Sequence, residues 1–349
     1  GLDELTVPLQ NNRIERATLE ALLEAAGSMR KVLQRYLRIK ADALGVENLE
    51  WYDLRAPVGR REGASLSWEQ AKRFVVEQID EFSEPMGRFY RQALASRWVE
   101  AEDRGGKAQG GFCTSLPASR EIRIFMTYGG TMTNVLTLAH ELGHAWHGWL
   151  MRDLPSAARK VPMTLAESAS TLSEKLVEAA AFGRAEGNRA VYLLDERLQR
   201  AVSFLLDIPA RFQLERAMHR EREDRQLRAG RLKELTREAF GDWFGDAVAS
   251  VDEYFWASKL HYYITRYPFY NFPYSFGYLF SKALYDRARG EGDGFARRID
   301  ALLMESGQFR AEELASRYLE ADLTEPAFWL DAASSIRADV DRYEELIRG

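Results

Sequence analysis

Apolar residues recur at helical spacing along most of the chain. Between residues 13 and 44 the positions that keep this spacing are Leu19, Leu22, Leu23, Ala26, Met29, Leu33 and Leu37. They predict one long amphipathic helix, because residues three and four apart share a helix face. The same periodicity recurs over residues 190–228, over residues 274–289 and after the segment 324–326.

Two helix starts carry capping signals. Ser67 is followed three residues later by Gln70, a capping-box spacing, and apolar residues at helical spacing come next. Ser83 precedes Pro85, and proline is favoured in the first helical turn because its missing N–H is not needed there. We expect one helix to begin at each of these serines.

One segment has the alternation of a strand. Over residues 121–128 the apolar positions on one face are Ile122, Ile124, Met126 and Tyr128. This period of two predicts a β-strand, which the pair Gly129 and Gly130 ends. Residues 104–111, rich in glycine and charge, are expected to form a loop.

These patterns predict a mainly α-helical protein with a small β element beside its centre. We expect one large domain over residues 1–349. Within it, a helical N-terminal part would cover about 1–110, the β element and the next helices 111–185, and a helical C-terminal part 186–349.

Composition narrows the function classes. The chain has 349 residues, 46% of them hydrophobic, which is enough to fill a core and argues against disorder. Lys and Arg number 48 against 53 Asp and Glu, a net charge of −5. Because binding to phosphate backbones needs a basic surface, nucleic acid is not expected as a partner.

The cysteine count and the hydropathy predict the compartment. Cys113 is alone, so neither an intramolecular disulfide nor a tetrathiolate metal site is possible, and a reducing, cytoplasmic setting is expected. We interpret it as a buried inert thiol, with a reactive thiol as the alternative. No apolar run approaches the roughly 18 residues of a membrane span, so no membrane partner is expected.

The strongest chemical signal is a cluster of histidines. His140, His144 and His147 lie within the segment HELGHAWH. On a helix, His140 and His144 would face the same side one turn apart and could bind one metal ion, with Glu141 beside the water on that ion. The alternative is a helix whose histidines are exposed or satisfied in the core. Imidazole and carboxylate donors favour zinc, one ion per chain, over iron or manganese.

A catalytic zinc site needs a third protein ligand. The metzincin pattern would place a histidine where this chain has Leu150, which excludes that class. His147 faces the right side, but three consecutive turns of a straight helix cannot converge on one ion. We expect it to support a ligand or to face the substrate, with a structural role as the alternative.

The next segment, residues 163–178, supplies candidate carboxylates. Glu167, Glu174 and Glu178 share the face opposite its apolar stripe. A solvated acidic face would explain this pattern too. Because only a short proline-containing connection separates the segment from the histidines, we predict Glu167 as the third ligand. Glu174 is expected to accept a hydrogen bond from a metal-bound imidazole.

HELGHAWH followed by LAESASTLSE resembles the signature of the oligoendopeptidase F and thimet oligopeptidase family of zinc metallopeptidases. That family pairs HExGHxxH with a downstream ExxSxxxE whose first Glu binds zinc, which matches Glu167. The resemblance extends to residues 49–57, 110–114 and the region of Tyr270, and is greatest to the oligoendopeptidase F branch. It implies a zincin-like helical catalytic domain that cleaves internal bonds of short unstructured oligopeptides.

Members of this family are longer than this chain and carry an additional helical region before the part matched here. We therefore expect this chain to correspond to the catalytic portion. Its first residue is Gly1 rather than Met, which agrees with a processed product or a fragment.

Residues 261–278 contain six tyrosines and one histidine. An aromatic packing layer is one explanation, but each buried phenol needs a hydrogen-bond partner. The functional interpretation is that phenols and His261 donate to the oxyanion formed at the attacked carbonyl. The resemblance implies catalytic roles for His261, Tyr274 and Tyr278 and substrate binding by Tyr270, with the choice among the tyrosines open. His147 is a further candidate for substrate binding.

The predicted mechanism is hydrolysis in which Glu141 takes a proton from the attacking water and passes it to the leaving amine. The strand over residues 122–128 is expected to pair with an extended substrate. Two alternatives remain: an exopeptidase resembling a metallocarboxypeptidase, and an inactive peptide-binding protein that keeps its metal.

Overall fold

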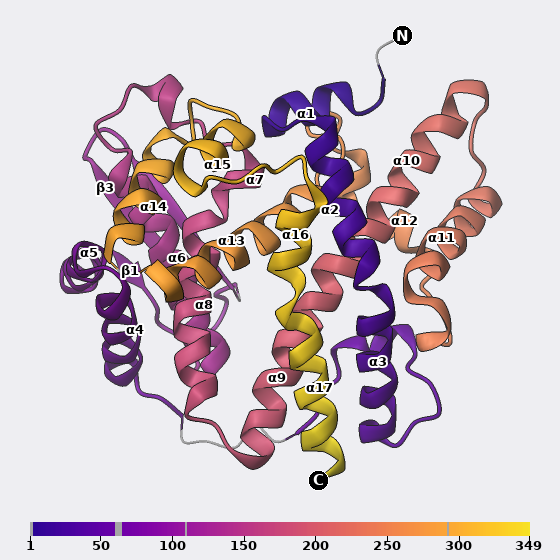
Figure 1. The fold of residues 1–349 in the computed structure, drawn as a ribbon, viewed down its shortest axis with the longest axis horizontal. Coiled ribbons are helices and arrows are strands. Elements are labelled where there is room, and N and C mark those ends of the chain that lie inside the picture. The colour runs from indigo at the N-terminus through magenta and orange to yellow at the C-terminus, as the bar shows by residue number, and fades with distance from the viewer. Residues whose placement is uncertain (1–2, 60–64, 109, 292) are drawn as a thin grey trace. The chain divides into compact units, whose positions relative to one another are not determined.

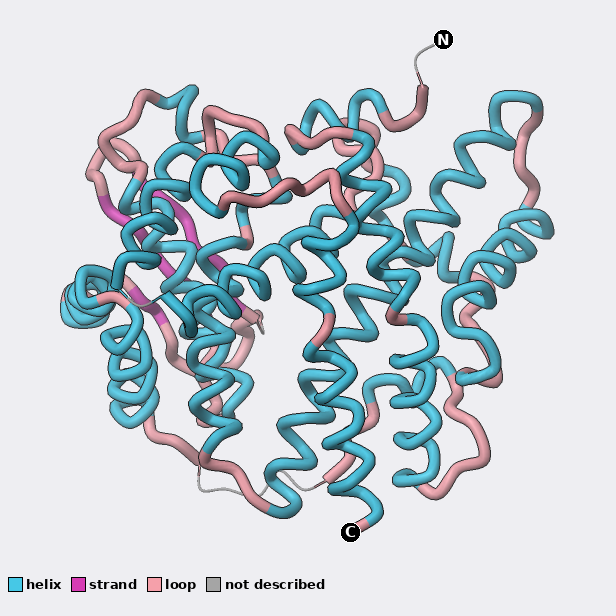
Figure 2. The backbone as a smooth tube through the Cα atoms, in the orientation of Figure 1, coloured by secondary structure: helices cyan, strands magenta, loops and turns pink. Residues whose placement is uncertain are grey.

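The computed structural model describes residues 3–59, 65–108, 110–291 and 293–349. The protein is mainly helical with one small sheet, as predicted, and Figure 2 shows the strands lying together among the helices. The chain forms two compact units. The first comprises Gly1–Glu62, Ala185–Phe276 and Leu323–Gly349, and the second Gly63–Arg184 and Gly277–Asp322. One large domain with three consecutive parts stays a prediction.

Helices build the first unit. They are α1 (Thr6–Asn12), α2 (Arg16–Ser28), α3 (Arg30–Leu44), α9 (Gly187–Val202), α10 (Ile208–Asp224), α11 (Ala229–Phe244), α12 (Phe255–Ser258), α16 (Pro326–Ala333) and α17 (Ser335–Arg348). Short 3-10 turns are η1 (Trp51–Arg55), η4 (Gly245–Ala247) and η5 (Leu260–Tyr263), and η3 (Ser203–Asp207) is a π-helical turn. Helix α13 (Phe272–Glu291) begins in this unit and continues in the second.

The predicted long helix over residues 13–44 is two helices that meet at Met29. The N–H of Met29 bonds to the carbonyl of Ala26 instead of continuing the regular four-residue ladder. Ser28 donates its hydroxyl to the carbonyl of Ala25, 2.7 Å away. Because Gly27 is flexible and Ser28 occupies a carbonyl, the first helix ends here and a second begins at Arg30.

The predicted helix over residues 190–228 is likewise interrupted. Helix α9 passes into the π-helical turn η3, and α10 follows with Pro209 in its first turn. Proline has no N–H to donate to the preceding turn, so the helical ladder changes just before it. Apolar periodicity alone could not reveal this change.

A buried carboxylate ties the first unit together. Asp195 on α9 is fully buried. Groups that donate hydrogen bonds to it within 3.3 Å belong to Tyr36, Lys40, Val58, Gln199 and Tyr343. They come from α3, α9, α17 and the segment after η1, and the three helices lie side by side in Figure 1. Burial lowers the pKa of Lys40, while Asp195 favours its charged form.

The second unit surrounds the sheet. Its helices are α4 (Trp68–Phe82), α5 (Glu84–Ala95), α6 (Met132–Leu150), α7 (Met163–Ala166), α8 (Ser168–Gly183), α14 (Asp293–Glu305) and α15 (Ala311–Leu319), with the 3-10 turn η2 (Ser156–Arg159). The strands are β1 (Val99–Glu100), β2 (Gly111–Leu116) and β3 (Glu121–Met126). Both predicted helix starts are confirmed: Ser67 forms a capping box with Gln70, and Ser83 caps α5.

Strand β3 is the predicted strand, and Ile122, Ile124 and Met126 are buried as expected. It is the middle strand of the order β1-β3-β2. The antiparallel strand β2 covers one edge over its whole length, from Gly111 opposite Met126 onwards, and β1 occupies the other at Ile124. The expectation that this segment pairs with a substrate is therefore wrong, because its hydrogen-bonding edges are used within the sheet.

The sequence did not reveal β2. Its side chains are mostly exposed, so no buried face imposes an alternation of apolar and polar residues. Strand β2 packs beside α6 and lies at one edge of the sheet.

Of the helices that the structure describes, none combines the length and the apolar character that crossing a membrane requires.

Candidate metal centre

Helix α6 carries the histidines and is held firmly. Thr131 and Asn134 form a capping box at its start, where the hydroxyl of Thr131 accepts from the N–H of Asn134 at 3.0 Å. The predicted stripe of Val135, Leu138 and Leu142 is fully buried. His140 and His144 lie on the other face with about a quarter of each side chain exposed. The apolar face thus fixes the helix, and its polar face borders a pocket.

Glu167 lies in the break between α7 and α8. The predicted continuous helix over residues 163–178 is interrupted at this residue, which serves as the N-cap of α8. Ser170, one turn into α8, donates its hydroxyl to Oε2 of Glu167 at 2.8 Å. The break and this hydrogen bond together orient the Glu167 carboxylate.

Two glycines allow the elements of the site to approach closely. A Cβ at Gly143, between the two histidines, would lie 2.6 Å from the carbonyl oxygen of Ala169 on α8. A Cβ at Gly277 on α13 would lie 3.2 Å from the Cβ of Glu167. Any side chain at Gly143 would push α6 from α8, and so separate the histidines from Glu167.

The three predicted ligands are brought together. One donor atom from each of His140, His144 and Glu167 lies within 4.8 Å of the others. Oε2 of Glu167 is 3.3 Å from Nε2 of His140 and 3.4 Å from Nε2 of His144. Two ligands on tetrahedral zinc, with bonds of about 2.0–2.1 Å, lie about 3.3–3.4 Å apart. The donor set and its spacing therefore fit a tetrahedral metal ion.

Charge at the centre also favours a cation. Nδ1 of His140 lies 3.3 Å from Oε2 of Glu174, the predicted second carboxylate. Burial lowers the pKa of His140, but Glu167 and Glu174 outweigh burial and raise it to about 10. Burial raises the pKa of Glu167, yet the two imidazoles hold it well below its usual range. Two carboxylates thus stabilise positive charge where a divalent ion would supply it.

Glu141 lies beside the three ligands but is not one of them. Its side chain is buried, and its Oε2 has no hydrogen-bond partner among the described residues. Burial raises the pKa of this carboxyl group. A Cβ at Gly111 on β2 would lie 2.9 Å from Oε1 of Glu141, so only a glycine leaves that side open. An unpaired carboxylate oxygen in a pocket is suited to accept a proton from water.

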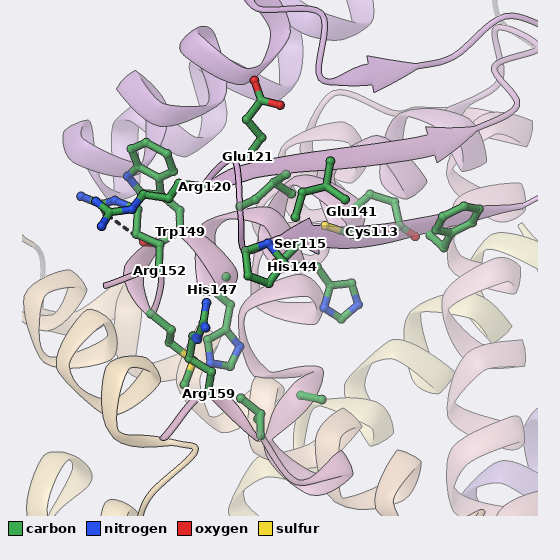
Figure 3. A pocket seen from close by; sticks show the side chains of 18 of the residues that line it. Cys113, Ser115, Arg120, Glu121, Glu141, His144, His147, Trp149, Arg152 and Arg159 are labelled. Carbon is green, nitrogen blue, oxygen red and sulfur yellow. Dashed lines mark hydrogen bonds between the residues drawn. The ribbon is translucent and has the colours of Figure 1, made fainter. Parts of the chain in front are cut away.

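The site opens into a pocket of about 710 Å³ that lies within the second unit. Its walls include β2, the polar face of α6 and the connection from α6 to α7. Figure 3 shows Glu141 and Cys113 on one side of this pocket and Arg120, Arg152 and Arg159 on the other. Cys113 is half-buried at the pocket wall rather than fully buried as predicted, and burial raises its pKa to about 12, which favours the interpretation as an inert thiol.

His147 does not join the metal ligands. Its side chain is buried, and Nε2 lies 2.8 Å from the hydroxyl of Ser306 and 3.1 Å from the carbonyl of Leu303. Burial lowers its pKa to about 4, so the imidazole is neutral. It links α6 to the end of α14 and also lines the pocket. Its role in substrate binding stays a prediction.

The aromatic segment forms a cluster in the first unit. The rings of His261 and Tyr270 stack with centroids 4.6 Å apart, and the hydroxyls of Tyr270 and Tyr274 lie 3.4 Å apart. Tyr278 belongs to the second unit, where it is only 6% exposed and Lys175 lies over its ring. The catalytic and substrate-binding roles of these four residues stay predictions.

Ser170 is a site residue to which the sequence analysis gave no role. Its position three residues after Glu167 could have indicated it, because such residues are neighbours on a helix. Replacing Ser170 with Ala should weaken metal binding about 10- to 100-fold, since the carboxylate loses the group that orients it. Titration against a competing chelator measures this.

Ser168→Ala is the matched control. Its hydroxyl belongs to the same helix but has no hydrogen-bond partner among the described residues. We expect its metal affinity to stay unchanged. Equal affinities in the two variants would show that Ser170 does not position Glu167.

Comparisons with known proteins agree with this geometry. The profile described as Peptidase family M3 matches residues 5–332. The chain is 25% identical over 347 residues to oligopeptidase PepF of Bacillus subtilis (strain 168), covering 97% of this chain and 51% of that protein. It is also 25% identical over 335 residues to the plasmid-encoded oligoendopeptidase F of Lactococcus lactis subsp. cremoris, covering 93% of this chain and 54% of that protein. The chain thus spans about half the length of these relatives.

Solved structures give the fold. Oligoendopeptidase F from Enterococcus faecium superposes with a TM-score of 0.73 at 21% identity, over 98% of this chain and 55% of that chain. At this identity the likeness shows a shared architecture, which is mainly helical with a small sheet.

Proposed function

Because this chain belongs to peptidase family M3, we propose that it is a zinc-dependent endopeptidase that hydrolyses internal bonds of short, unstructured oligopeptides. The observation that carries the proposal is the cluster of His140, His144 and Glu167 within 4.8 Å, with the unpaired carboxylate oxygen of Glu141 on the same helix. Relatives named oligopeptidase and oligoendopeptidase support the substrate class. A reducing, cytoplasmic setting belongs to the proposal, because the chain has a single cysteine.

His140, His144 and Glu167 would hold the ion. Zinc is favoured because two imidazoles and one carboxylate are the ligand set of many catalytic zinc sites. When bound, zinc supplies Lewis acidity, which polarises a carbonyl and lowers the pKa of water. Glu174 would keep His140 in the tautomer that presents Nε2, and Ser170 would keep the Glu167 carboxylate in place.

Glu141 would move the proton. Its buried carboxylate has one oxygen to which no described residue donates a hydrogen bond, and burial raises its pKa. In the proposed reaction it removes a proton from the attacking water and later donates it to the amine of the leaving fragment. The roles assigned to His261, Tyr274 and Tyr278 in catalysis, and to Tyr270 and His147 in substrate binding, rest on the resemblance and belong to the same proposal.

Strand β2 replaces β3 as the strand that would bind the substrate backbone. It is the edge strand next to α6, and its side chains are mostly exposed. An extended peptide can add to such an edge through main-chain hydrogen bonds, which recognise length and conformation more than side chains. Gly111 leaves room for a backbone beside Glu141.

The test combines metal analysis with cleavage of an internally quenched peptide that is blocked at both termini. We expect about one zinc ion per chain, cleavage that stops when the ion is removed by a chelator, and recovery when zinc is added. Cleavage that survives complete metal removal would contradict the proposal. Hydrolysis of unblocked peptides only would indicate an exopeptidase, and metal binding without any hydrolysis a peptide-binding protein.

A further inference from the structure

The pocket has a basic end, which we define as Arg120, Arg152, Arg159 and Lys160. All four line the pocket. In Figure 3 the three arginines lie on the side away from Glu141 and Cys113. This concentration of positive charge contrasts with the net charge of −5 of the whole chain.

The described residues around the basic end neutralise only part of its charge. Arg120 and Arg152 share one carboxylate, that of Asp153, at 3.3 and 3.5 Å. Among the residues that the structure describes, half-buried Arg159 and exposed Lys160 have no carboxylate within 4.0 Å. A partly desolvated guanidinium without a counter-ion is costly, and an anion placed beside it gains charge-assisted hydrogen bonds.

The other carboxylate at this end is already engaged. Glu121 lines the pocket, but Arg123 holds its Oε2 at 2.7 Å. Glu167 is one of the three clustered metal donors, and Glu141 lies beside them on α6. Among the described residues none supplies a carboxylate to Arg159 or Lys160, so both are available to an anionic group of a bound molecule.

The direction of strand β2 indicates which end of a bound peptide would lie at the basic end. The strand begins at Gly111, next to Glu141, and ends at Leu116, followed by Pro117 and Arg120 on the pocket wall. A peptide that adds antiparallel to β2 runs the opposite way, and antiparallel pairing is the more stable arrangement. The residues before the cleaved bond would then lie toward the basic end.

We propose that the basic end binds a carboxylate of the peptide substrate, supplied by an acidic side chain before the cleaved bond. Because a paired peptide advances one residue for each strand residue, the five steps from Gly111 to Leu116 correspond to a position about five residues before that bond. The inference rests on the proposed function. A free C-terminal carboxylate offers the same chemistry and would be the source if the peptide ran parallel to β2.

The test uses internally quenched peptides of one sequence, blocked at both termini, in which Glu or Gln is moved along the chain. Mass spectrometry of the products identifies the cleaved bond. We expect kcat/KM to be about tenfold higher for Glu than for Gln at one of the positions before that bond, with a smaller ratio at high salt. A second pair of peptides compares a free C-terminal carboxylate with its amide.

Substitutions locate the effect. Arg159→Gln with Lys160→Gln should abolish the Glu preference. The matched control, Arg73→Gln with Arg289→Gln, removes the same charge from exposed positions outside the pocket and should preserve it. Arg159→Glu with Lys160→Glu should reverse the preference toward Lys.

Binding of the same peptides to the metal-loaded Glu141→Gln variant, followed by fluorescence anisotropy, provides a readout that needs no turnover. The ratio of kcat/KM for the Glu peptide to that for the Gln peptide is measured on the wild-type protein. It therefore does not depend on whether any pocket variant folds. Equal rates and equal affinities for Glu and Gln, and for acid and amide, would overturn the inference. Cleavage of all these peptides alike would leave the proposed function intact. If the protein preferred the free C-terminal carboxylate over its amide but did not distinguish Glu from Gln, the proposed acidic side chain would be wrong and the C-terminus would be the source of the carboxylate.

Discussion

Replacing Glu141 with Gln is expected to lower kcat by about a thousandfold or more while metal binding persists. The amide has nearly the shape of the carboxylate, so the packing of the buried side chain is retained. It cannot accept a proton from water, because its lone pairs are far less basic. Since Glu141 is not among the three clustered donors, the affinity for the ion should change little.

The measurement is kcat on a doubly blocked quenched peptide together with metal content by mass spectrometry. Glu81→Gln, at an exposed position on α4, makes the same chemical change outside the pocket and should leave both unchanged. Full activity in Glu141→Gln would refute the assignment of the base. Loss of the metal as well would mean that this carboxylate takes part in holding the ion.

The second large effect concerns stability. Asp195→Ala should reduce the free energy of unfolding by about 3–5 kcal/mol, because it leaves the ammonium group of Lys40 buried without its counter-ion. It also removes the acceptor for the hydroxyls of Tyr36 and Tyr343. Unpaired buried polar groups keep their full desolvation cost.

Urea denaturation followed by tryptophan fluorescence measures this change. Asp246→Ala removes an aspartate of the same unit that pairs with Arg38 at the surface, where water screens the charges, and should have little effect. A double variant, Lys40→Met with Asp195→Leu, removes both buried charges and should recover much of the loss. If Asp195→Ala were no more destabilising than Asp246→Ala, the carboxylate would not be the centre of this network.

Close packing explains why the metal centre depends on small residues that bind nothing. Gly143 has no Cβ, and a Cβ at this position would lie only 2.6 Å from the backbone of α8. The helix that carries His140 and His144 can therefore lie against the helix that follows Glu167. The spacing between the histidines is local, whereas their distance from Glu167 is a property of this contact between helices.

The sequence by itself determined what depends on neighbours along the chain. Helical periodicity located most helices, capping residues located the starts of α4 and α5, and the spacing of His140, His144 and Glu141 indicated a metal and a base. The sequence reveals these features because residues one helical turn apart are neighbours on the helix surface, independently of the rest of the fold.

Only the tertiary structure decided what depends on residues far apart in sequence. It made β3 the middle strand of the sheet and β2 an edge strand, assembled five donors around Asp195, and gathered Arg120 with Arg159 in one pocket. The breaks at Met29 and before Pro209 were also missed, since one or two residues set them within uninterrupted apolar patterns. Long-range contacts form by burying surfaces against one another, and no periodicity in the chain encodes which surfaces meet.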